Sequence, residues 1–322
     1  MKILGITGAL PQEKVVHGED KKKFVRLTGV HTRFISSDSE TFYTLGLRAA
    51  QSLLEKLKIN PEDIGFCISN SQTNDRFYPN IAFKFAENLK LHRESMAFDM
   101  HLGCSALPNV LKVASGLFAN SSQQKPYGII IIGDTLSKQS LKTDESTYPL
   151  FGDAVTAVVI TKSTEHYEYG NFWIDEENPS IYVNGLGYDD NGSLNVNREV
   201  AKLNNTVMKG DKVFEFVSNE VFKFLDSKNL KNNFDLFAFH QGNKFTNDLL
   251  INKLGFNKSQ SLESIHLFGN TSCASICMSI IGSQNKIQLE RSNRLLLSGF
   301  GIGLNASYSL ITLDKNACLQ IV

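Results

Sequence analysis

Short apolar runs alternate with stretches of helical spacing along the first half of this chain. Runs at residues 64–69, 96–101, 128–133 and 154–161 have the length of buried strands. The N-terminal ten residues hold a shorter apolar run broken by two glycines, which predicts a strand and a turn rather than a signal peptide. Strands that alternate with helices are typical of an α/β protein with buried sheets.

Between these strands, helices are predicted by apolar residues that recur every three or four positions. Ser37-x-x-Glu40 has the form of a capping box, and the helix after it should end before Pro61. A second helix should begin near Ser105, where Pro108 is tolerated in the first turn.

The second half shows a similar order of elements. A helix over about residues 211–225 is followed by a strand at 234–239 and then by a helix that Gly255 can cap. A helix rich in small residues follows Asn270. The last two strands are predicted at residues 294–298 and 306–312.

This repeated order indicates a duplication, with a join near residues 162–172. We therefore expect two similar halves, residues 1–165 and residues 166–322, with the nucleophile candidate described below in the first half.

The composition is ordinary for a soluble globular protein, since 42% of the 322 residues are hydrophobic and 20% are charged. The 33 basic side chains are balanced by 33 acidic ones, which argues against nucleic acid as the main partner because phosphate binding needs a basic surplus. No apolar stretch approaches the roughly 20 residues of a membrane span. We expect neither a nucleic-acid partner nor a membrane span.

Five cysteines are scattered along the chain without a Cys-x-x-Cys pair. This spacing predicts neither a disulfide framework nor a zinc site. A reducing cytoplasm is the expected location, and no bound metal is expected.

Cys104 differs from the other cysteines because it lies between a predicted strand and a predicted helix. A helix N-terminus offers free N–H groups and the positive end of the helix dipole, which favour a thiolate. The alternative is a buried and inert cysteine, which is the commoner role of a single cysteine.

Three further elements carry residues that suit a catalytic site. His240 ends an apolar strand, and ligands gather at strand ends in α/β sheets. Asn270 precedes small residues that lead into a helix, and Gly299-Phe-Gly-Ile-Gly303 allows a tight turn whose N–H groups can face a ligand. Taken singly, each has a structural alternative: a histidine bonded to a loop, close backbone packing, or a plain hairpin turn.

Together, in this order and spacing, the four elements resemble the thiolase superfamily, and specifically its β-ketoacyl-acyl carrier protein synthase III branch. The resemblance covers nearly the whole chain and includes Thr28-Gly-Val30 with Arg33, and Phe151-Gly-Asp153. It implies an α/β, thiolase-like, five-layered α-β-α-β-α fold made of two similar halves. It also implies a homodimer.

The resemblance implies a role for each element. Cys104 would accept an acyl group from a thioester, and a malonyl-type thioester would then lose carbon dioxide to give an enolate that attacks the acyl-cysteine. His240 and Asn270 would donate hydrogen bonds to the enolate oxygen, while the N–H groups of Cys104 and of Gly301-Ile302-Gly303 would hold the other oxyanion. We accordingly expect an acyltransferase that makes β-ketoacyl thioesters for fatty acid or specialised acyl-chain biosynthesis.

The chain differs from other family members at the positions that bind coenzyme A. Lys23, Leu27 and Glu145 align with a tryptophan and arginines that hold the adenine, and none of the three can stack on it as tryptophan does. Asp211 replaces an asparagine of the pantetheine tunnel, whereas Asn243 is kept. With no bound cofactor expected, the substrates are phosphopantetheine thioesters, and acyl carrier protein is expected in preference to coenzyme A.

Carrier proteins are acidic, so a basic rim is expected at the tunnel mouth. Lys209, Lys212 and Lys244 are near enough in the resembled fold to form it, although a solvated surface lysine is the commoner role for each. Tyr78 matches the position from which family members send an aromatic side chain across the dimer interface to close the partner's acyl pocket. A core aromatic is the alternative for Tyr78.

Three other functions stay open. The acyl group can pass to an alcohol or amine without decarboxylation, as in some natural-product and surface-glycan relatives, although the retained Asn270 argues against this. A non-decarboxylating Claisen condensation needs a base, and residues 70–79 offer only Asp75. A non-catalytic partner subunit commonly lacks the nucleophile or the histidine, and this chain has both.

Overall fold

The protein, seen as a computed structural model, is described at residues 1–76, 78–120, 125–174, 180–183, 187–188, 194–195, 206–288 and 290–322. The strands are β1 (Lys2–Ala9), β2 (Glu13–Val16), β3 (Thr32–Ile35), β4 (Ile64–Asn70), β5 (Met96–Met100), β6 (Tyr127–Asp134), β7 (Ala154–Thr161), β8 (Glu168–Trp173), β9 (Ile181–Val183), β10 (Gly187–Tyr188), β11 (Leu194–Asn195), β12 (Thr206–Met208), β13 (Leu236–Phe239), β14 (Asn293–Gly301) and β15 (Asn305–Ile321). The α-helices are α1 (Lys22–Thr28), α2 (Phe42–Leu57), α3 (Ile81–Asn88), α4 (Ala106–Asn120), α6 (Gly210–Phe216), α7 (Phe222–Asp226), α8 (Lys244–Leu254), α9 (Ile265–Phe268) and α10 (Ser275–Gly282).

One mixed sheet runs through the described part of the molecule, in the order β13-β14-β15-β1-β7-β6-β4-β5, with β8 paired to β15. Strand β15 connects the two parts of this sheet. Its residues 305–313 pair with β14, and its residues 312–321 pair in parallel with β1. The last strand therefore joins the strands of the first half to those of the second. The division at residues 165 and 166 stays a prediction.

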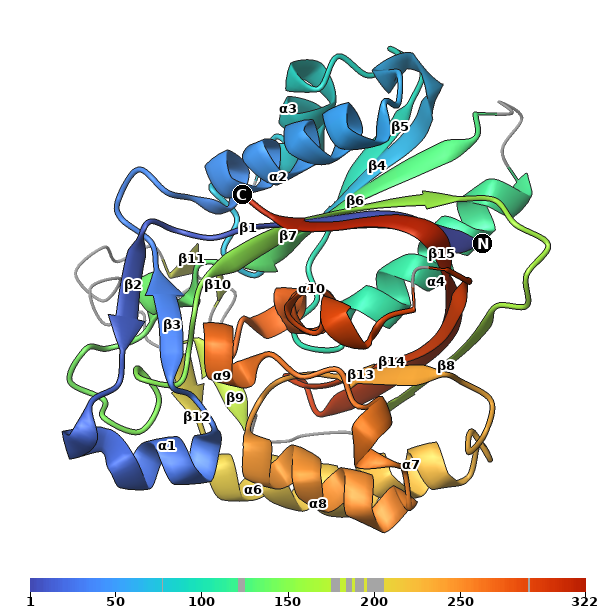
Figure 1. Cartoon of the computed structure of the whole chain (residues 1–322). Coiled ribbons are helices and arrows are strands. Elements are labelled where there is room, and N and C mark those ends of the chain that lie inside the picture. The colour runs from blue at the N-terminus through green and yellow to red at the C-terminus, as the bar shows by residue number, and fades with distance from the viewer. Residues whose placement is uncertain are drawn as a thin grey trace.

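Helices cover both outer faces of the sheet and fill the space between its two parts (Figure 1). α2 and α3 pack on the outer side of β1, β4, β6 and β7. α4 and α10 lie between the strands of the first half and those of the second, and α6, α7 and α8 cover the far side of β13 and β14. These α-β-α-β-α layers confirm the expected fold.

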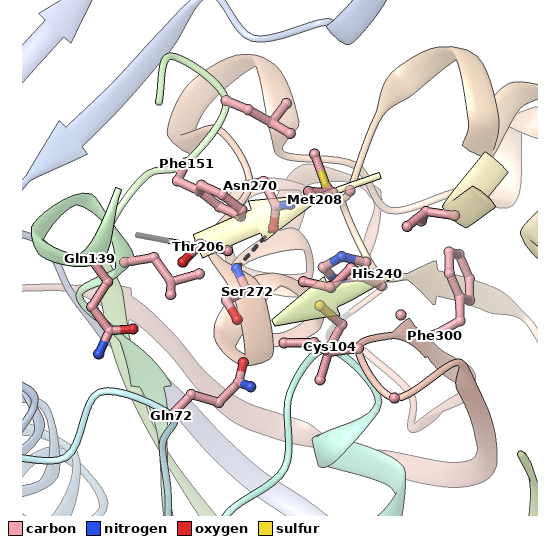
Figure 2. A pocket seen from close by; sticks show the side chains of 18 of the residues that line it. Gln72, Cys104, Gln139, Phe151, Thr206, Met208, His240, Asn270, Ser272 and Phe300 are labelled. Carbon is pink, nitrogen blue, oxygen red and sulfur yellow. Dashed lines mark hydrogen bonds between the residues drawn. The ribbon is translucent and has the colours of Figure 1, made fainter. Parts of the chain in front are cut away.

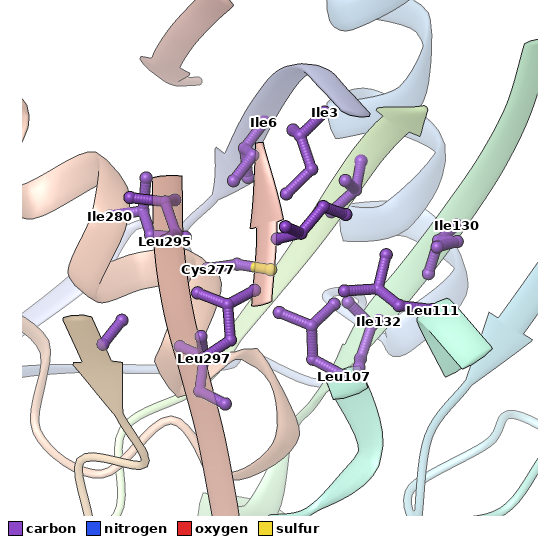
Figure 3. Packing of buried hydrophobic residues seen from close by; sticks show 14 of the residues in the cluster. Ile3, Ile6, Leu107, Leu111, Ile130, Ile132, Cys277, Ile280, Leu295 and Leu297 are labelled. Atoms are coloured by element: carbon purple, nitrogen blue, oxygen red, sulfur yellow. The ribbon is translucent and has the colours of Figure 1, made fainter. Parts of the chain in front are cut away.

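The central layer is apolar on both of its sides (Figure 3). Ile130 and Ile132 of β6, like Leu295 and Leu297 of β14, point into it because side chains alternate between the two faces of a strand. Burial of one such side chain stabilises the fold by roughly 1.5–3 kcal/mol. The labelled core residues from the remaining elements are Ile3, Ile6, Leu107, Leu111, Cys277 and Ile280. This packing fixes α4, and with it the loop that carries Cys104.

The start of α2 differs from the sequence-based prediction. Thr41 is the N-cap, since its Oγ1 accepts the Thr44 N–H while Thr44 Oγ1 accepts the Thr41 N–H. Ser37 and Glu40 instead close a separate turn, in which Glu40 Oε2 accepts from both the N–H and the hydroxyl of Ser37. The capping box predicted at Ser37 is therefore wrong for this helix, whereas its end at Leu57 agrees with the prediction.

Two elements of the second half are more complex than predicted. The helix expected over about residues 211–225 consists of α6 and α7 with a π-helical turn, Val217–Val221, between them. Strand β15 continues to Ile321, past the predicted end at residue 312, because its second part pairs with β1. Gly255 ends α8 with a φ of 64°, as predicted.

Candidate active site

A cavity of about 1360 Å³ is lined by residues from both halves of the chain. Cys104, His240 and Asn270, which come from three separate loops, all face it (Figure 2). The structure thus brings together the three residues that the sequence indicates as a site.

Cys104 lies between β5 and α4, two residues before the helix begins. Two glycines at the end of β14 allow other backbone to approach it closely. A Cβ atom on Gly299 would lie 2.4 Å from the carbonyl oxygen of Cys104, and one on Gly301 would lie 3.1 Å from its Sγ. Glycine at these positions therefore lets the end of β14 pack directly against the thiol.

Burial raises the pKa of the Cys104 thiol to about 12. The N–H groups of Ile302 and Cys104 and the hydroxyl of Ser272 act in the opposite direction, while the Asp134 carboxylate adds to the rise. Desolvation of the thiol therefore opposes the thiolate that the helix N-terminus is expected to favour.

His240 follows β13 and is buried. Its Nδ1 lies 2.7 Å from the Oγ of Ser275, and that oxygen also accepts the N–H of Gln241 at 3.3 Å. The roles in this contact depend on the ring tautomer: where the Ser275 hydroxyl donates to Nδ1, the ring hydrogen lies on Nε2. Burial lowers the pKa of the imidazole to about 4, against a smaller opposing effect of the Ser272 backbone, so the ring is neutral at physiological pH.

The side-chain amide of Asn270 is oriented by its neighbour. Its Oδ1 accepts the N–H of Ser272 at 3.0 Å, the contact drawn as a dashed line in Figure 2. Because the oxygen is engaged, the Nδ2 hydrogens are the ones available to the cavity. The Asn270 backbone donates to the carbonyl of Leu150 and accepts from the N–H of Gly152, at 2.9 and 3.0 Å.

The segment at residues 148–152, which bonds to the backbone of Asn270, is held in place by Arg33. The buried Arg33 donates from Nη1 to the carbonyls of Tyr148 and Phe151, each at 2.8 Å. Gly152 packs so closely that a Cβ atom there would lie 2.0 Å from the carbonyl oxygen of Phe268. The Arg33 and Phe151-Gly-Asp153 segments, far apart in sequence, therefore form one support for Asn270.

Comparisons with known proteins identify the family. The family model described as 3-oxoacyl-[acyl-carrier-protein] synthase III matches residues 98–176, and the model of its C-terminal part matches residues 225–313. β-Ketoacyl-[acyl-carrier-protein] synthase III of Streptococcus uberis is 32% identical over 285 residues, which cover 86% of this chain and 86% of that protein. The chain belongs to the β-ketoacyl-acyl carrier protein synthase III family.

Further relatives agree with this membership. The synthase III of Campylobacter jejuni is 29% identical over 319 residues, covering 93% of this chain and 94% of its own. The crystal structure of a 3-oxoacyl-(acyl-carrier protein) synthase from Burkholderia xenovorans LB400 matches with a TM-score of 0.85 at 25% identity, covering 100% of this chain and 96% of that one.

Other predicted residues of this synthase III family member also reach the cavity. Gly301, Ile302 and Gly303 line it beside Cys104. Asn243 lines it too, although its Oδ1 caps α8 by accepting the N–H of Phe245 at 2.9 Å. Tyr78 lines the cavity and is 85% exposed. Its reach across a dimer interface stays a prediction.

The three lysines predicted to dock a carrier lie on the surface beside α6 and α8. Lys212 is 3.5 Å from Glu215, and Lys244 pairs with Asp248. Lys209 directly precedes α6, next to Gly210 of the cavity wall. Their docking role stays a prediction, and the ion pairs of Lys212 and Lys244 reduce the positive charge that these side chains present.

The acid considered as an alternative base has a structural role instead. Asp75 accepts the hydroxyl of Thr41 at 2.6 Å and the N–H of Tyr43 at 3.1 Å, at the start of α2. Two bonds to the helix start engage this carboxylate, which disfavours a proton-abstracting function for it.

Several residues of the site were not predicted from the sequence. Ser275 orients His240 from 35 positions away, and no local pattern indicates such a contact. Gln72 follows the end of β4, a strand-end position that could have identified it. Gln139 and Thr206, which also line the cavity, carry no comparable signal.

Among the residues that the structure describes, no group of three or more His, Cys, Asp or Glu side chains is arranged to hold a metal ion. Every helix in the same ranges is too short or too polar to span a bilayer.

Proposed function

We propose that this protein catalyses the decarboxylative Claisen condensation of a Cys104-bound acyl group with a malonyl-type thioester. The product is a β-ketoacyl thioester for fatty acid or specialised acyl-chain biosynthesis. The observation that carries the proposal is the pair of oriented donors: Ser275 engages Nδ1 of His240, and Ser272 engages Oδ1 of Asn270. With the Ser275 hydroxyl as the donor to Nδ1, both side chains offer N–H groups to the cavity that contains the thiol.

The first step loads the acyl group. The Cys104 sulfur attacks the thioester carbonyl, its S–H bond breaks, and the carrier leaves as a thiol that takes up the equivalent of that proton. The N–H groups of Cys104 and Ile302, which lower the thiol pKa, also suit the oxyanion of this step. Because the free thiol is neutral, deprotonation accompanies attack rather than preceding it.

The second step forms the new carbon–carbon bond. The malonyl carboxylate leaves as carbon dioxide, and its bonding electrons form an enolate whose oxygen is stabilised by His240 and Asn270. The enolate carbon attacks the acyl-cysteine carbonyl and expels the Cys104 thiolate, which takes up one proton from solvent. Neutral donors suit this step, since an imidazole with a pKa of about 4 keeps its Nε2 hydrogen without adding a charge that would hold the carboxylate.

Acyl transfer to an alcohol or amine is the weaker alternative. That reaction needs the thiol and an oxyanion site, but it forms no enolate. The amide of Asn270, held by Ser272 and by the backbone of residues 150–152, would then have no chemical role.

The proposed acyl donor and malonyl donor are thioesters of an acyl carrier protein. Lys209, Lys212 and Lys244, beside the cavity, provide positive charge for an acidic carrier. Glu145, an aligned coenzyme A position, is exposed and lies 3.7 Å from Lys21, and its carboxylate would repel a phosphate there. The cytoplasm stays the predicted location.

We also propose a homodimer that pairs the β5 edges of two copies. β5 ends the described sheet, and an edge strand presents unpaired backbone groups. Exposed apolar residues gather near this edge: Tyr78 is 85% exposed, Phe83 57% and Met96 54%. A second copy would cover them.

The condensation is tested by incubating the purified protein with an acyl carrier protein thioester and a malonyl carrier protein labelled at its free carboxylate. We expect labelled carbon dioxide and β-ketoacyl carrier protein in equal amounts. Acylation of Cys104 with no release of carbon dioxide, and transfer to an added alcohol or amine, would contradict the proposal.

A further inference from the structure

One side of the cavity is lined by neutral polar side chains. Gln72, Gln139 and Thr206 all face the cavity, and Figure 2 shows them on one side of Cys104, with His240 and Phe300 on the other. The oxygen of the Gln72 amide comes within 3.0 Å of the place where a Cβ atom on Gly103 would stand, so it lies beside the residue that precedes the nucleophile.

These polar groups have no partners among the described residues. The Oγ1 of Thr206 is buried without a hydrogen bond, and the residue is only 4% exposed. The side-chain amides of Gln72 and Gln139 likewise bond to no residue in the described ranges. Thr206 is buried, whereas the two glutamines are half-buried. Because buried polar groups in folded proteins are nearly always paired, the unpaired Thr206 hydroxyl beside two unpaired amides indicates a polar ligand.

Exposure increases from β12 to the start of α6, and this gradient indicates which part of a substrate contacts the three polar side chains. Thr206 is buried, Met208 is partly exposed and Gly210, at the start of α6, is exposed. The carrier arm therefore enters at the Gly210 end, beside the lysines of α6 and α8. The acyl group then occupies the inner end, at Thr206 and Gln139.

The charged residues of the cavity lining limit which substituents the acyl group can carry. The described lining contains no lysine or arginine to pair with an anionic substituent. Asp99, which also lines the cavity, already accepts bonds from the Ser69 hydroxyl and from the N–H groups of Ile81 and Ala82, at 2.6 to 2.8 Å. Leu136 and Phe151 supply apolar wall beside the amides. An uncharged substituent that both donates and accepts hydrogen bonds fits this surface.

We propose that Gln72, Gln139 and Thr206 form a polar acyl subsite, and that the acyl group loaded on Cys104 bears a hydroxyl on one of its first carbons. This inference rests on the proposed function, since it assumes that Cys104 is acylated. A plain alkyl chain would leave the three polar groups desolvated and unpaired, which disfavours its binding.

The test compares two acyl carrier protein thioesters of equal chain length, 3-hydroxybutyryl and butyryl, by the rate at which each acylates Cys104 in intact-mass measurements. We expect the hydroxylated group to load about 10- to 100-fold faster per unit concentration. Gln72→Leu, Gln139→Leu and the isosteric Thr206→Val should each reduce this ratio. Gln51→Leu, on the exposed face of α2, should leave it unchanged.

Different results would overturn the polar subsite and the proposed function. Butyryl loading as fast as, or faster than, hydroxybutyryl loading would overturn the polar subsite while leaving the proposed function intact. A ratio that none of the three subsite variants changes, in proteins that unfold at the wild-type temperature, would also overturn it. Failure of both thioesters to acylate Cys104 would overturn the proposed function, and the subsite with it.

Discussion

The Nδ1 atom of His240 lies 2.7 Å from the Oγ of Ser275, and the proposed mechanism requires the Ser275 hydroxyl to be the donor in this contact. Ser275 Oγ also accepts the N–H of Gln241, and when its own hydrogen is donated to Nδ1 the imidazole hydrogen lies on Nε2. Ser275 touches no substrate in the proposed mechanism. It is a positioning residue for the enolate donor.

Replacement Ser275→Ala should therefore slow decarboxylation by about 10-fold, less than the 10²–10³-fold typical of losing an oxyanion donor outright. Loading of Cys104 should change little, because the proposed loading step does not use Nε2. Rates of carbon dioxide release and of acylation measure the two steps separately. Ser279→Ala is the matched control, since Ser279 is also buried on α10 but bonds to the carbonyl of Ile276. Equal losses in both steps, or in both variants, would show that Ser275 has only a structural role.

Replacement Asn270→Ala should reduce decarboxylation by about 10²–10³-fold, because one of the two enolate donors is lost. Acyl loading should persist within a few-fold of wild type. His240→Ala should likewise reduce decarboxylation far more than acyl loading. If Asn270→Ala leaves product formation untouched while loading proceeds, plain acyl transfer becomes the preferred function.

The Cys104 thiol should react as a neutral thiol in the free protein, because burial raises its pKa to about 12. The rate of alkylation by iodoacetamide should rise about tenfold per pH unit from neutrality to about pH 9, following the small thiolate fraction. Peptide mapping of the modified protein distinguishes Cys104 from the other four thiols. A plateau near neutral pH would instead indicate a thiolate stabilised by the start of α4.

The buried imidazole of His240 should make stability depend on pH. Above the ordinary pKa of 6.5 the ring is neutral in both the folded and unfolded states. As the pH falls from 6.5 towards about 4, the unfolded chain takes up a proton that the folded protein does not, so the free energy of unfolding falls by up to roughly 1.4 kcal/mol per pH unit. His240→Gln should lack this contribution, and urea unfolding at several pH values measures the difference. Parallel pH profiles for the two proteins would argue against a neutral buried His240.

Acyl carrier protein thioesters should load Cys104 faster than the matching coenzyme A thioesters. The advantage should shrink at high salt, since steering between charged surfaces is screened. Reversing the charge of Lys209, Lys212 and Lys244 together should also reduce it. Reversal of Lys90, an exposed lysine after α3, is the control. Equal loading from both carriers at low salt would contradict this assignment.

The sequence predicts most of the fold because apolar periodicity is strong in buried strands and in helices that face a core. It misplaces the cap of α2, since Ser37 and Thr41 are both good caps and only the packing of the helix decides between them. It also stops β15 short, because the polar residues after 312 form a strand only through pairing with β1.

The site is predictable to the extent that its residues lie at strand ends and glycine turns. Cys104, His240 and Asn270 have such positions, and the structure places all three at one cavity. The pKa of Cys104 is not predictable, since burial depends on residues distant in sequence, whereas a helix start can be identified locally. The Ser275 contact and the cavity positions of Gln139 and Thr206 likewise exist only after folding.

The proposed mechanism requires that Cys104 carries the acyl chain that is condensed. The most direct test is the intact mass of the protein after incubation with an acyl carrier protein thioester, for wild type, for Cys104→Ala and for a variant in which the other four cysteines are replaced by serine or alanine. We predict one acyl group per chain on wild type and on the variant that keeps only Cys104, released as β-ketoacyl product when malonyl carrier protein is added, and none on Cys104→Ala. An acyl group recovered on the Cys104→Ala protein would show that Cys104 is not the nucleophile.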